Sequence, residues 1–400
     1  MPPTFARNAI VLGLLTAIGP FAIDMYLPAL PSISADLKAS TSATQATLMV
    51  FFVAFGVCQM AYGPVSDMFG RKPPLYAGLT LFVAASIGCA FCPTIGWLIV
   101  FRFIQGVGAS AIMVIPRAVI RDLHTGLEAT RLMSLVMLVF SVSPILAPLI
   151  GSALIVPFGW RAVFVAITIA AALGLLLVAF LLPETRPPDQ RIGSGLRSML
   201  AGYSFLLRDR RFLALTLIGA FGMASFFAFL ASSSFIYIDH FGLTPTQYSL
   251  AFGLNAIGFI GTSQFSAHLA ERFGVSRVVL TAVACYTVMA VLLFAMTAAG
   301  VTNLGVLMMM LFLAFAWLGL VIPSTMVLAL EEHGPIAGMA SALAGTVQML
   351  AGAAIIALVS VFFDGTALPM VTTIALCALA AFVLSWFTLQ TRTMVAKPAE

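Results

Sequence analysis

The stretch WLIVFRFIQGVGASAIMVIP, residues 97–116, is an apolar run of 20 residues that contains a single charge, Arg102. At ~1.5 Å of rise per residue, a helix of this length covers about 30 Å, the thickness of the hydrocarbon core of a bilayer. A guanidinium group inside that core costs at least ~2.5–3.5 kcal/mol on insertion scales. The stretch therefore predicts a membrane-spanning helix whose arginine has a partner or a function.

The composition of the chain extends this prediction to all 400 residues. Hydrophobic residues make up 62% of the chain and charged residues 8%, and the mean hydropathy is +1.11. A water-soluble protein of this size needs far more charge to cover its surface, so lipid is the solvent for most of the chain. The runs lack the alternation of barrel strands, and open sheets cannot satisfy their edges in lipid. We therefore predict an all-α polytopic membrane protein.

Windows of about 20 apolar residues predict twelve membrane-spanning helices. Their ranges are 8–29, 45–63, 75–92, 97–119, 132–156, 162–182, 212–236, 247–266, 278–298, 304–328, 338–362 and 369–389.

The distribution of basic residues orients these spans. If both termini are cytoplasmic, only Lys38 and Arg161 fall in loops on the other side, and Arg102 lies within a span. The remaining lysines and arginines are cytoplasmic, as the positive-inside rule requires. They are Arg7, Arg71, Lys72, Arg117, Arg121, Arg131, Arg186, Arg191, Arg197, Arg208, Arg210, Arg211, Arg272, Arg277, Arg392 and Lys397.

A polar segment in the middle of the chain divides it into two halves of six spans. Residues 184–211 carry nine charges and predict a cytoplasmic linker between an N-terminal half, 1–183, and a C-terminal half, 212–400. A short repeat supports this division, because AYGPVSDMFGRK follows the second span and FSAHLAERFGVS, 204 residues later, follows the eighth. Two six-helix repeats around a site at the middle of the membrane are typical of secondary transporters.

The stretch GPVSDMFGRKP, residues 63–73, resembles the signature loop of the major facilitator superfamily. Its glycines permit a tight turn and a close approach of helices. The resemblance implies a cytoplasmic latch in which an acid and an arginine hold the two halves together. The residues that would form this gating loop are Gly63, Asp67, Gly70, Arg71 and Asp122. Met68 stands where the family often has a further arginine.

Two further stretches resemble motifs of the same superfamily. RFIQGVGAS, residues 102–110, resembles its fourth-span motif and places Gln105 close to Arg102. SPILAPLIGS, residues 143–152, resembles the fifth-span motif of its exporters. Within that motif, Pro144 and Pro148 each remove a backbone hydrogen bond, and Gly151 admits a close neighbour.

Finally, IDMYLPALP, residues 23–31, resembles the first span of the bicyclomycin and chloramphenicol resistance (Bcr/CflA) family of proton-driven drug exporters. LPETRPP and SALAGTVQML fit the same family. The resemblance covers nearly the whole chain. It implies a multi-pass protein of the bacterial inner membrane that exports small antibiotics in exchange for protons.

Asp24 is the one acid that lies well inside a predicted span, and it is a candidate partner for Arg102. Counted along each helix, both residues lie roughly 6–8 Å below the same membrane face. An ion pair would lower the cost of the buried arginine, and a proton could break that pair. We favour the ion pair. Snorkelling to the headgroups is the first alternative, and bonding to backbone carbonyls or water is the second. Tyr26 offers a ring and a hydroxyl group to a ligand, or belongs to an interfacial belt.

Other functional classes fit the sequence less well. The chain has three lysines, none of which follows a glycine-rich phosphate loop, and its four histidines lack metal-ligand spacing. We therefore expect a transporter that is not an enzyme, has no cofactor or metal, binds no nucleic acid and acts as a monomer on a small drug and protons. The main alternative is a proton-coupled importer of a small metabolite.

Overall fold

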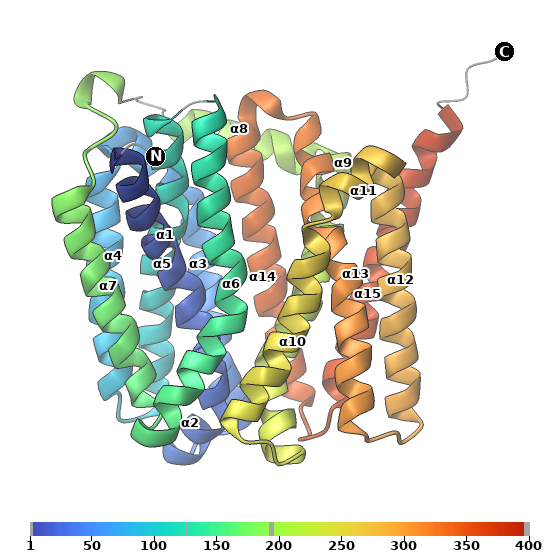
Figure 1. Cartoon of the computed structure of the whole chain (residues 1–400). Coiled ribbons are helices and arrows are strands. Elements are labelled where there is room, and N and C mark those ends of the chain that lie inside the picture. The colour runs from blue at the N-terminus through green and yellow to red at the C-terminus, as the bar shows by residue number, and fades with distance from the viewer. Residues whose placement is uncertain (1–2, 125, 192–195, 396–400) are drawn as a thin grey trace. The chain divides into compact units, whose positions relative to one another are not determined.

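The computed structural model describes residues 3–124, 126–191 and 196–395, and its regular structure in these ranges is entirely helical (Figure 1). The predicted all-α class is confirmed. The described α-helices are α1 (Pro3–Asp24), α2 (Leu30–Asp36), α3 (Thr41–Phe69), α4 (Lys72–Phe91), α5 (Ile95–Leu123), α6 (Gly126–Phe158), α7 (Arg161–Leu181), α8 (Leu196–Arg208), α9 (Arg210–Ser234), α10 (Pro245–Ser263), α11 (Ser266–Phe273), α12 (Val275–Ala298), α13 (Leu304–Glu331), α14 (Ala337–Phe362) and α15 (Leu368–Val395). Shorter helical turns are η1 (Leu27–Ala29), η2 (Pro188–Gln190), η3 (Phe235–His240) and η4 (Gly334–Ile336).

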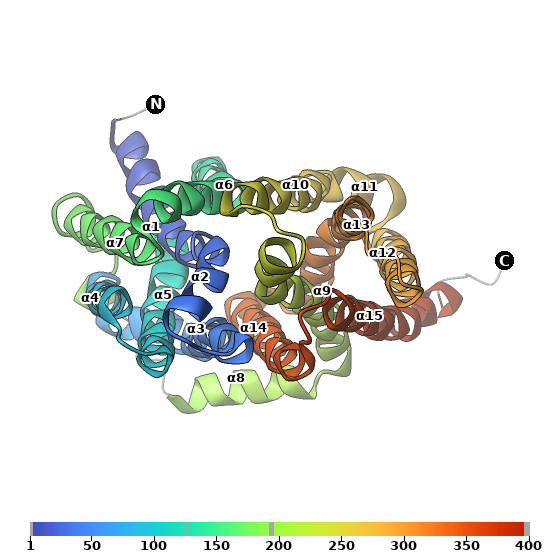
Figure 2. The same ribbon diagram turned by 90° about the horizontal axis from the view of Figure 1, so that it is seen from below.

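Contacts between residues divide the chain into two units. Unit 1 comprises Met1–Leu196 and Leu243–Leu250, and unit 2 comprises Arg197–Gly242 and Ala251–Glu400. Within unit 1, α5 packs along both α3 and α4, and α1 packs along α6 and α7 (Figure 2). Within unit 2, α9 packs against α13, α14 and α15, and α12 packs against α13 and α15. The predicted boundaries of the halves and the linker stay a prediction. Residues 192–195 of that linker, and the predicted cytoplasmic Lys397, lie outside the described residues.

Of the described helical segments, eleven are long and apolar enough to cross a membrane. They correspond to all the predicted spans except the eighth, 247–266, which coincides with α10. This helix has 19 residues and carries Thr246, Gln247, Asn255 and Thr262 among its apolar side chains, and it does not reach the mean hydropathy of the eleven segments over a window of 18 residues. A count of twelve spans, like the location of the termini, therefore stays a prediction.

Small residues allow α5 to pack closely against its neighbours in unit 1. A Cβ atom on Gly106 would lie 2.5 Å from the carbonyl oxygen of Phe51 in α3, and one on Gly108 would lie 2.6 Å from that of Gly78 in α4. Any larger residue would force these helices apart. The glycines of the fourth-span motif therefore bring α5, with Arg102, into the interior of unit 1.

The fifth-span motif lies in α6, which continues as one helix through Pro144 and Pro148. Gly151 of this motif faces the backbone of Met25, and a Cβ atom at this position would overlap the Met25 carbonyl oxygen. The predicted close approach at Gly151 is present. It brings α6 against the residue that directly follows α1.

Candidate functional sites

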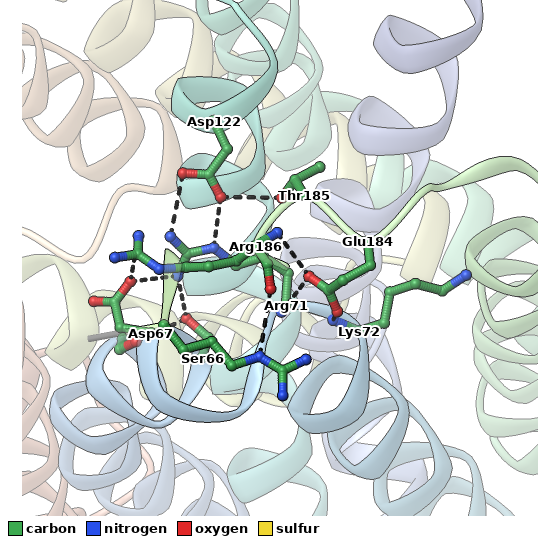
Figure 3. Close-up of polar contacts among 10 residues, drawn as sticks. Ser66, Asp67, Arg71, Lys72, Asp122, Glu184, Thr185 and Arg186 are labelled. Carbon is green, nitrogen blue, oxygen red and sulfur yellow. Dashed lines mark hydrogen bonds and ion pairs between the residues drawn. The ribbon is translucent and has the colours of Figure 1, made fainter. Parts of the chain in front are cut away.

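The first candidate site lies in unit 1 where α3 ends and α4 begins (Figure 3). Helix α3 ends at Phe69, and Gly70 turns the chain with a φ angle of +91°. This left-handed conformation strains any residue with a Cβ atom. A Cβ atom here would also lie 2.8 Å from Glu184 Oε2. Gly70 therefore serves both the turn and the contact with Glu184.

Arg71 is the centre of this site, and its side chain is only 3% exposed. Its Nε donates to Asp122 Oδ2 at 2.7 Å, and its Nη2 donates to Asp122 Oδ1 at 3.3 Å. Its Nη1 donates to Asp67 Oδ1 and to Ser66 Oγ, each at 2.7 Å. The guanidinium group thus joins the end of α3 to the last turn of α5 through two carboxylates.

Residues 182–187, which we call the linker strap, complete the site from the far end of α7. Glu184 Oε1 accepts hydrogen bonds from the backbone N–H groups of Arg71 at 2.8 Å and of Arg186 at 3.0 Å, and Oε2 accepts one from Lys72 at 3.0 Å. The Lys72 ammonium group in turn donates to the Leu182 carbonyl at 2.8 Å. The carboxylate therefore holds the first backbone N–H groups of α4, where the helix dipole favours a negative charge.

The strap also contacts the two acids that hold Arg71. Arg186 Nη1 lies 3.2 Å from Asp67 Oδ1, and Thr185 Oγ1 donates to Asp122 Oδ2 at 3.0 Å. Arg186 thus brings a second positive charge to Asp67, in a loop where Met68 replaces the arginine that is common in the family. We call Ser66, Asp67, Arg71, Lys72, Asp122 and the strap together the signature-loop network.

The contacts of the network shift the acidity of its members in the directions that favour their charges. Partial burial by itself would raise the pKa of Glu184, but the backbone N–H groups of Arg71, Lys72 and Arg186 outweigh it and lower that pKa. Burial likewise opposes the charge of Arg71, whereas hydrogen bonding to Asp122 and the charges of both acids raise its pKa. The contacts of the network therefore favour the charged forms of Glu184 and Arg71.

The sequence predicted part of this site. Asp67, Gly70, Arg71 and Asp122 lie together, as the resemblance implied. The close approach of a second helix expected at Gly63 is wrong, since no atom of a neighbouring element lies within 4 Å of the position that its Cβ would take. Sequence reasoning missed the roles of Glu184, Thr185 and Arg186, although LPETRPP had been noted as a family stretch. The sequence signal that could have identified Glu184 is its position as an acid shortly after the apolar span 162–182.

The second candidate site surrounds Arg102, which is 0% exposed inside unit 1. Its guanidinium carbon lies 4.6 Å from the ring centroid of Tyr26 and 4.4 Å from that of Phe51, so the cation lies against two aromatic rings. Its Nη1 donates to Gln105 Oε1 at 2.6 Å and to the Ala22 carbonyl at 3.2 Å. Complete burial excludes snorkelling to the headgroups.

A break in the first span supplies the Ala22 carbonyl. Helix α1 ends at Asp24, and the chain turns at Met25 and Tyr26 before η1 begins. Pro28 explains the position of this break, because a proline ring clashes with the carbonyl four residues earlier, here that of Asp24. Carbonyls in the last turn of a helix lack helical donors, and Arg102 provides one for Ala22.

Asp24 does not form the ion pair that sequence depth suggested. It is 6% exposed, and the ion pairs of the described residues include none between Asp24 and Arg102. Counting residues gives the height of a side chain in the membrane but not the side of the helix on which it lies. Of the alternatives considered for Arg102, the structure shows bonding to a backbone carbonyl, that of Ala22.

Further hydrogen bonds fix the residues around Arg102. Gln105 Nε2 donates to Ser86 Oγ at 2.7 Å, which orients the amide oxygen toward the guanidinium group. Tyr26 and Thr47 share a hydrogen bond of 2.8 Å between their hydroxyl groups. Within the described chain, Nε and Nη2 of Arg102 make no hydrogen bond. Two charged donors are thus held in a rigid aromatic and polar frame.

A charge network at one end of the spanning helices and a polar cluster buried among them are arrangements found in membrane transporters. Comparison with known proteins identifies the family. The profile of the Major Facilitator Superfamily matches residues 12–356, and the chain belongs to this family of transporters.

The relatives of known sequence narrow the branch of that family. The "Uncharacterized MFS-type transporter YdgK" of Bacillus subtilis (strain 168) is 37% identical over 367 residues, which cover 90% of each chain. The "Bicyclomycin resistance protein homolog" of Haemophilus influenzae is 30% identical and covers 96% of each chain. "Multidrug resistance protein D" of Escherichia coli (strain K12) is 29% identical and covers 96% of this chain and 95% of its own. The predicted membership of the Bcr/CflA branch, with multi-pass insertion in a bacterial inner membrane, is confirmed.

Solved structures agree on the fold. A D-xylose-proton symporter superposes with a TM-score of 0.74 at 16% identity, covering 96% of this chain and 97% of its own. A POT family transporter in complex with 5-aminolevulinic acid superposes with a TM-score of 0.76 at 12% identity, covering 98% of this chain and 97% of its own. At these identities, the similarity shows the fold alone.

Proposed function

We propose that the protein exports small neutral antibiotics across the bacterial inner membrane in exchange for protons, by alternating access. The observation that carries the proposal is the frame around Arg102. Within the described chain, it holds two charged donors that make no hydrogen bond. Tyr26 of this frame lies two residues after Asp24, a buried acid that makes no ion pair among the described residues. The names of the relatives support the class of cargo.

In this mechanism, Arg102 and Asp24 have separate tasks. Arg102 Nε and Nη2 donate to oxygen atoms of the drug, while Gln105 and Tyr26 hold the guanidinium group in place. Asp24 takes up a proton from outside and releases it inside, without breaking an ion pair with Arg102. Exchange of a neutral drug for a proton moves net positive charge inward, so the membrane potential and the pH gradient both drive export.

The proposal includes the predicted topology. Twelve spans in two halves, 1–183 and 212–400, are joined by a cytoplasmic linker, 184–211, and both termini are cytoplasmic. The chain acts as a monomer. The signature-loop network, with Asp67, Arg71 and Asp122, gates the cytoplasmic side. The prolines and Gly151 of the fifth span shape the path of an exporter.

Tolerance and vesicle orientation test this function. Overexpression in a susceptible bacterium should raise tolerance to phenicols or bicyclomycin-like compounds, and Asp24→Asn present at the same level in the membrane should remove the gain. Inside-out vesicles should accumulate the drug when their interior is acidified, whereas right-side-out vesicles should expel it. Proton-driven accumulation in right-side-out vesicles would favour the alternative, an importer of a small metabolite.

A further inference from the structure

Helix α8 directly precedes α9, and its axis is not parallel to those of the membrane-spanning helices of unit 2. In Figure 2, α9, α12 and α13 are seen nearly end-on, whereas α8 is seen along its length. It therefore lies roughly across the direction of the spans. Only Asp209 separates it from α9, which begins at Arg210 and belongs to a membrane-spanning segment. This short connection places the end of α8 at the level where the span leaves the hydrocarbon.

Contacts within unit 2 fix the corner between α8 and α9. Asp209 Oδ1 accepts hydrogen bonds from the N–H groups of Arg211 at 2.8 Å and Phe212 at 3.1 Å, and so caps the start of α9. Asp209 Oδ2 lies 3.1 Å from His333 Nε2, and Arg211 pairs with Glu332. Both partners belong to the connection between α13 and α14. The direction of α8 is thus set by this corner.

One side of α8 packs on the protein. Leu206 is 0% and Tyr203 is 7% exposed, and a Cβ atom on Gly202 would lie 2.8 Å from Met339 Cε in α14. The close approach at Gly202, together with the buried Tyr203 and Leu206, shows that this side of α8 faces the protein.

A second, apolar side of α8 is open. Leu200 is 59% and Leu207 is 50% exposed. At 3.6 residues per turn, these two residues lie within about 20° of each other, and Leu207 lies about 100° from Leu206. They form a stripe next to the side that packs on the protein, which is where a helix resting on both a protein and a membrane carries its lipid-facing residues.

Basic residues adjoin this stripe. Arg208 ends α8 and Arg210 begins α9, and both are exposed. Among the described residues, neither makes an ion pair, whereas Arg211 is paired with Glu332. A guanidinium group beside an apolar stripe at the membrane boundary complements the phosphate of an anionic phospholipid.

We infer that α8 lies in the headgroup region of the bilayer and binds anionic phospholipid, with Leu200 and Leu207 inserted among the upper acyl carbons and Arg208 and Arg210 on the phosphates. The linker is then attached to the membrane at the entrance to α9. This surface is independent of the transported substrate and of the direction of transport.

Spin-label accessibility tests the position of the helix in the full chain, reconstituted in nanodiscs after replacement of the native cysteines. Labels at Leu200→Cys and Leu207→Cys should collide with oxygen more than with a water-soluble nickel chelate. The matched control is Ala201→Cys, an exposed position about 100° around the helix from Leu200, where the order should reverse. Equal access of the chelate to Leu200→Cys and Ala201→Cys would overturn the insertion of the stripe.

Lipid titration tests the charge complementarity. Binding of phosphatidylglycerol and phosphatidylcholine to the intact protein is measured by native mass spectrometry. The double variant Arg208→Gln, Arg210→Gln should weaken phosphatidylglycerol binding by roughly tenfold or more and leave phosphatidylcholine binding unchanged. Arg277→Gln, which removes an exposed charge of unit 2 away from α8, should retain it. Equal phosphatidylglycerol binding by the double variant and the unchanged protein would contradict the inference.

Discussion

The two copies of the loop repeat, 61–72 in unit 1 and 265–276 in unit 2, end in the same turn but carry different chemistry. In each copy, a helix ends at Phe-Gly, and the glycine has a positive φ angle, +91° at Gly70 and +84° at Gly274. Arg71 of the first copy corresponds to Val275 of the second. Within the part of the chain that the structure describes, Glu271 makes no ion pair or hydrogen bond, whereas its counterpart Asp67 binds two arginines.

The comparison separates what the fold requires from what function requires. The turn recurs because each helix must end where the next one begins, and glycine permits the necessary φ angle. The charges do not recur. Of the described residues, the buried aspartate and arginine side chains, Asp24, Arg71 and Arg102, all belong to unit 1. Buried charge is costly in a membrane protein, and its restriction to one unit is the reason why we propose that this unit carries the gating and coupling groups.

The largest predicted effect on stability and transport is that of removing Arg71, the arginine that the second copy of the loop lacks. Arg71→Ala leaves Asp67 and Asp122 close to each other without their main partner, and we expect a loss of about 2–4 kcal/mol in the free energy of unfolding and of nearly all transport. The control in the second copy is Arg272→Ala, the arginine nearest to the turn before Gly274. Among the described contacts, this change removes only the one with the Phe273 ring. Thermal unfolding in detergent and drug uptake by vesicles measure both. Similar losses in the two variants would refute the assignment of gating to the first copy.

Substitutions of Gly70 and Gly274 should differ less in their effects on stability and transport than the two arginine substitutions do. Alanine at Gly70 or Gly274 would have to adopt a positive φ angle with an extended ψ angle, at a cost of about 1–3 kcal/mol. Gly70→Ala must also displace Glu184, whereas Gly274 has open space around its Cβ position. Both variants should lower the melting temperature, but only Gly70→Ala should slow transport as well. Equal transport rates for the Gly70→Ala and Gly274→Ala variants would show that the contact between Gly70 and Glu184 has no role in transport.

These predictions rest on residues that the sequence revealed to different extents. Asp67, Gly70 and Arg71 are close along the chain, so a loop motif could identify them together. Asp122 lies in the last turn of α5, beyond the predicted span 97–119, and was found by its resemblance to the family pattern. Glu184 reaches the loop from 113 residues away, and only the fold could reveal that contact.

The site inside the membrane was harder to predict. The cost of a buried charge predicted that Arg102 needs a partner, but its hydrogen-bond partners are Gln105 and a carbonyl freed by the break after Asp24, not a carboxylate. Pro28, four residues beyond Asp24, marked that break in the sequence. A pattern of charges alone could not distinguish a carboxylate from a backbone oxygen, because both satisfy a guanidinium group.

The smallest predicted effect concerns the strap and pH. The lowered pKa of Glu184 means that the folded state gains stability from this carboxylate at neutral pH and loses it as the pH falls below about 4. Glu184→Gln should therefore melt at a lower temperature than the unchanged protein at pH 7, and the gap should close in acid. Glu271→Gln serves as the control and should show no such gap. A constant gap for Glu184→Gln across the pH range would mean that its charge is not what stabilises the strap.

The central claim is that unit 1 couples proton movement to drug export. The most direct test is to measure drug transport by the Asp24→Asn variant in reconstituted vesicles. Two modes are compared in the same preparation: uptake driven by an imposed pH gradient, and exchange of labelled for unlabelled drug with no gradient. Asparagine keeps the size of the side chain but cannot exchange a proton, and Arg102 keeps its donors. We predict that gradient-driven uptake disappears while exchange continues at a rate near that of the unchanged protein. Gradient-driven uptake at the normal rate would contradict the account.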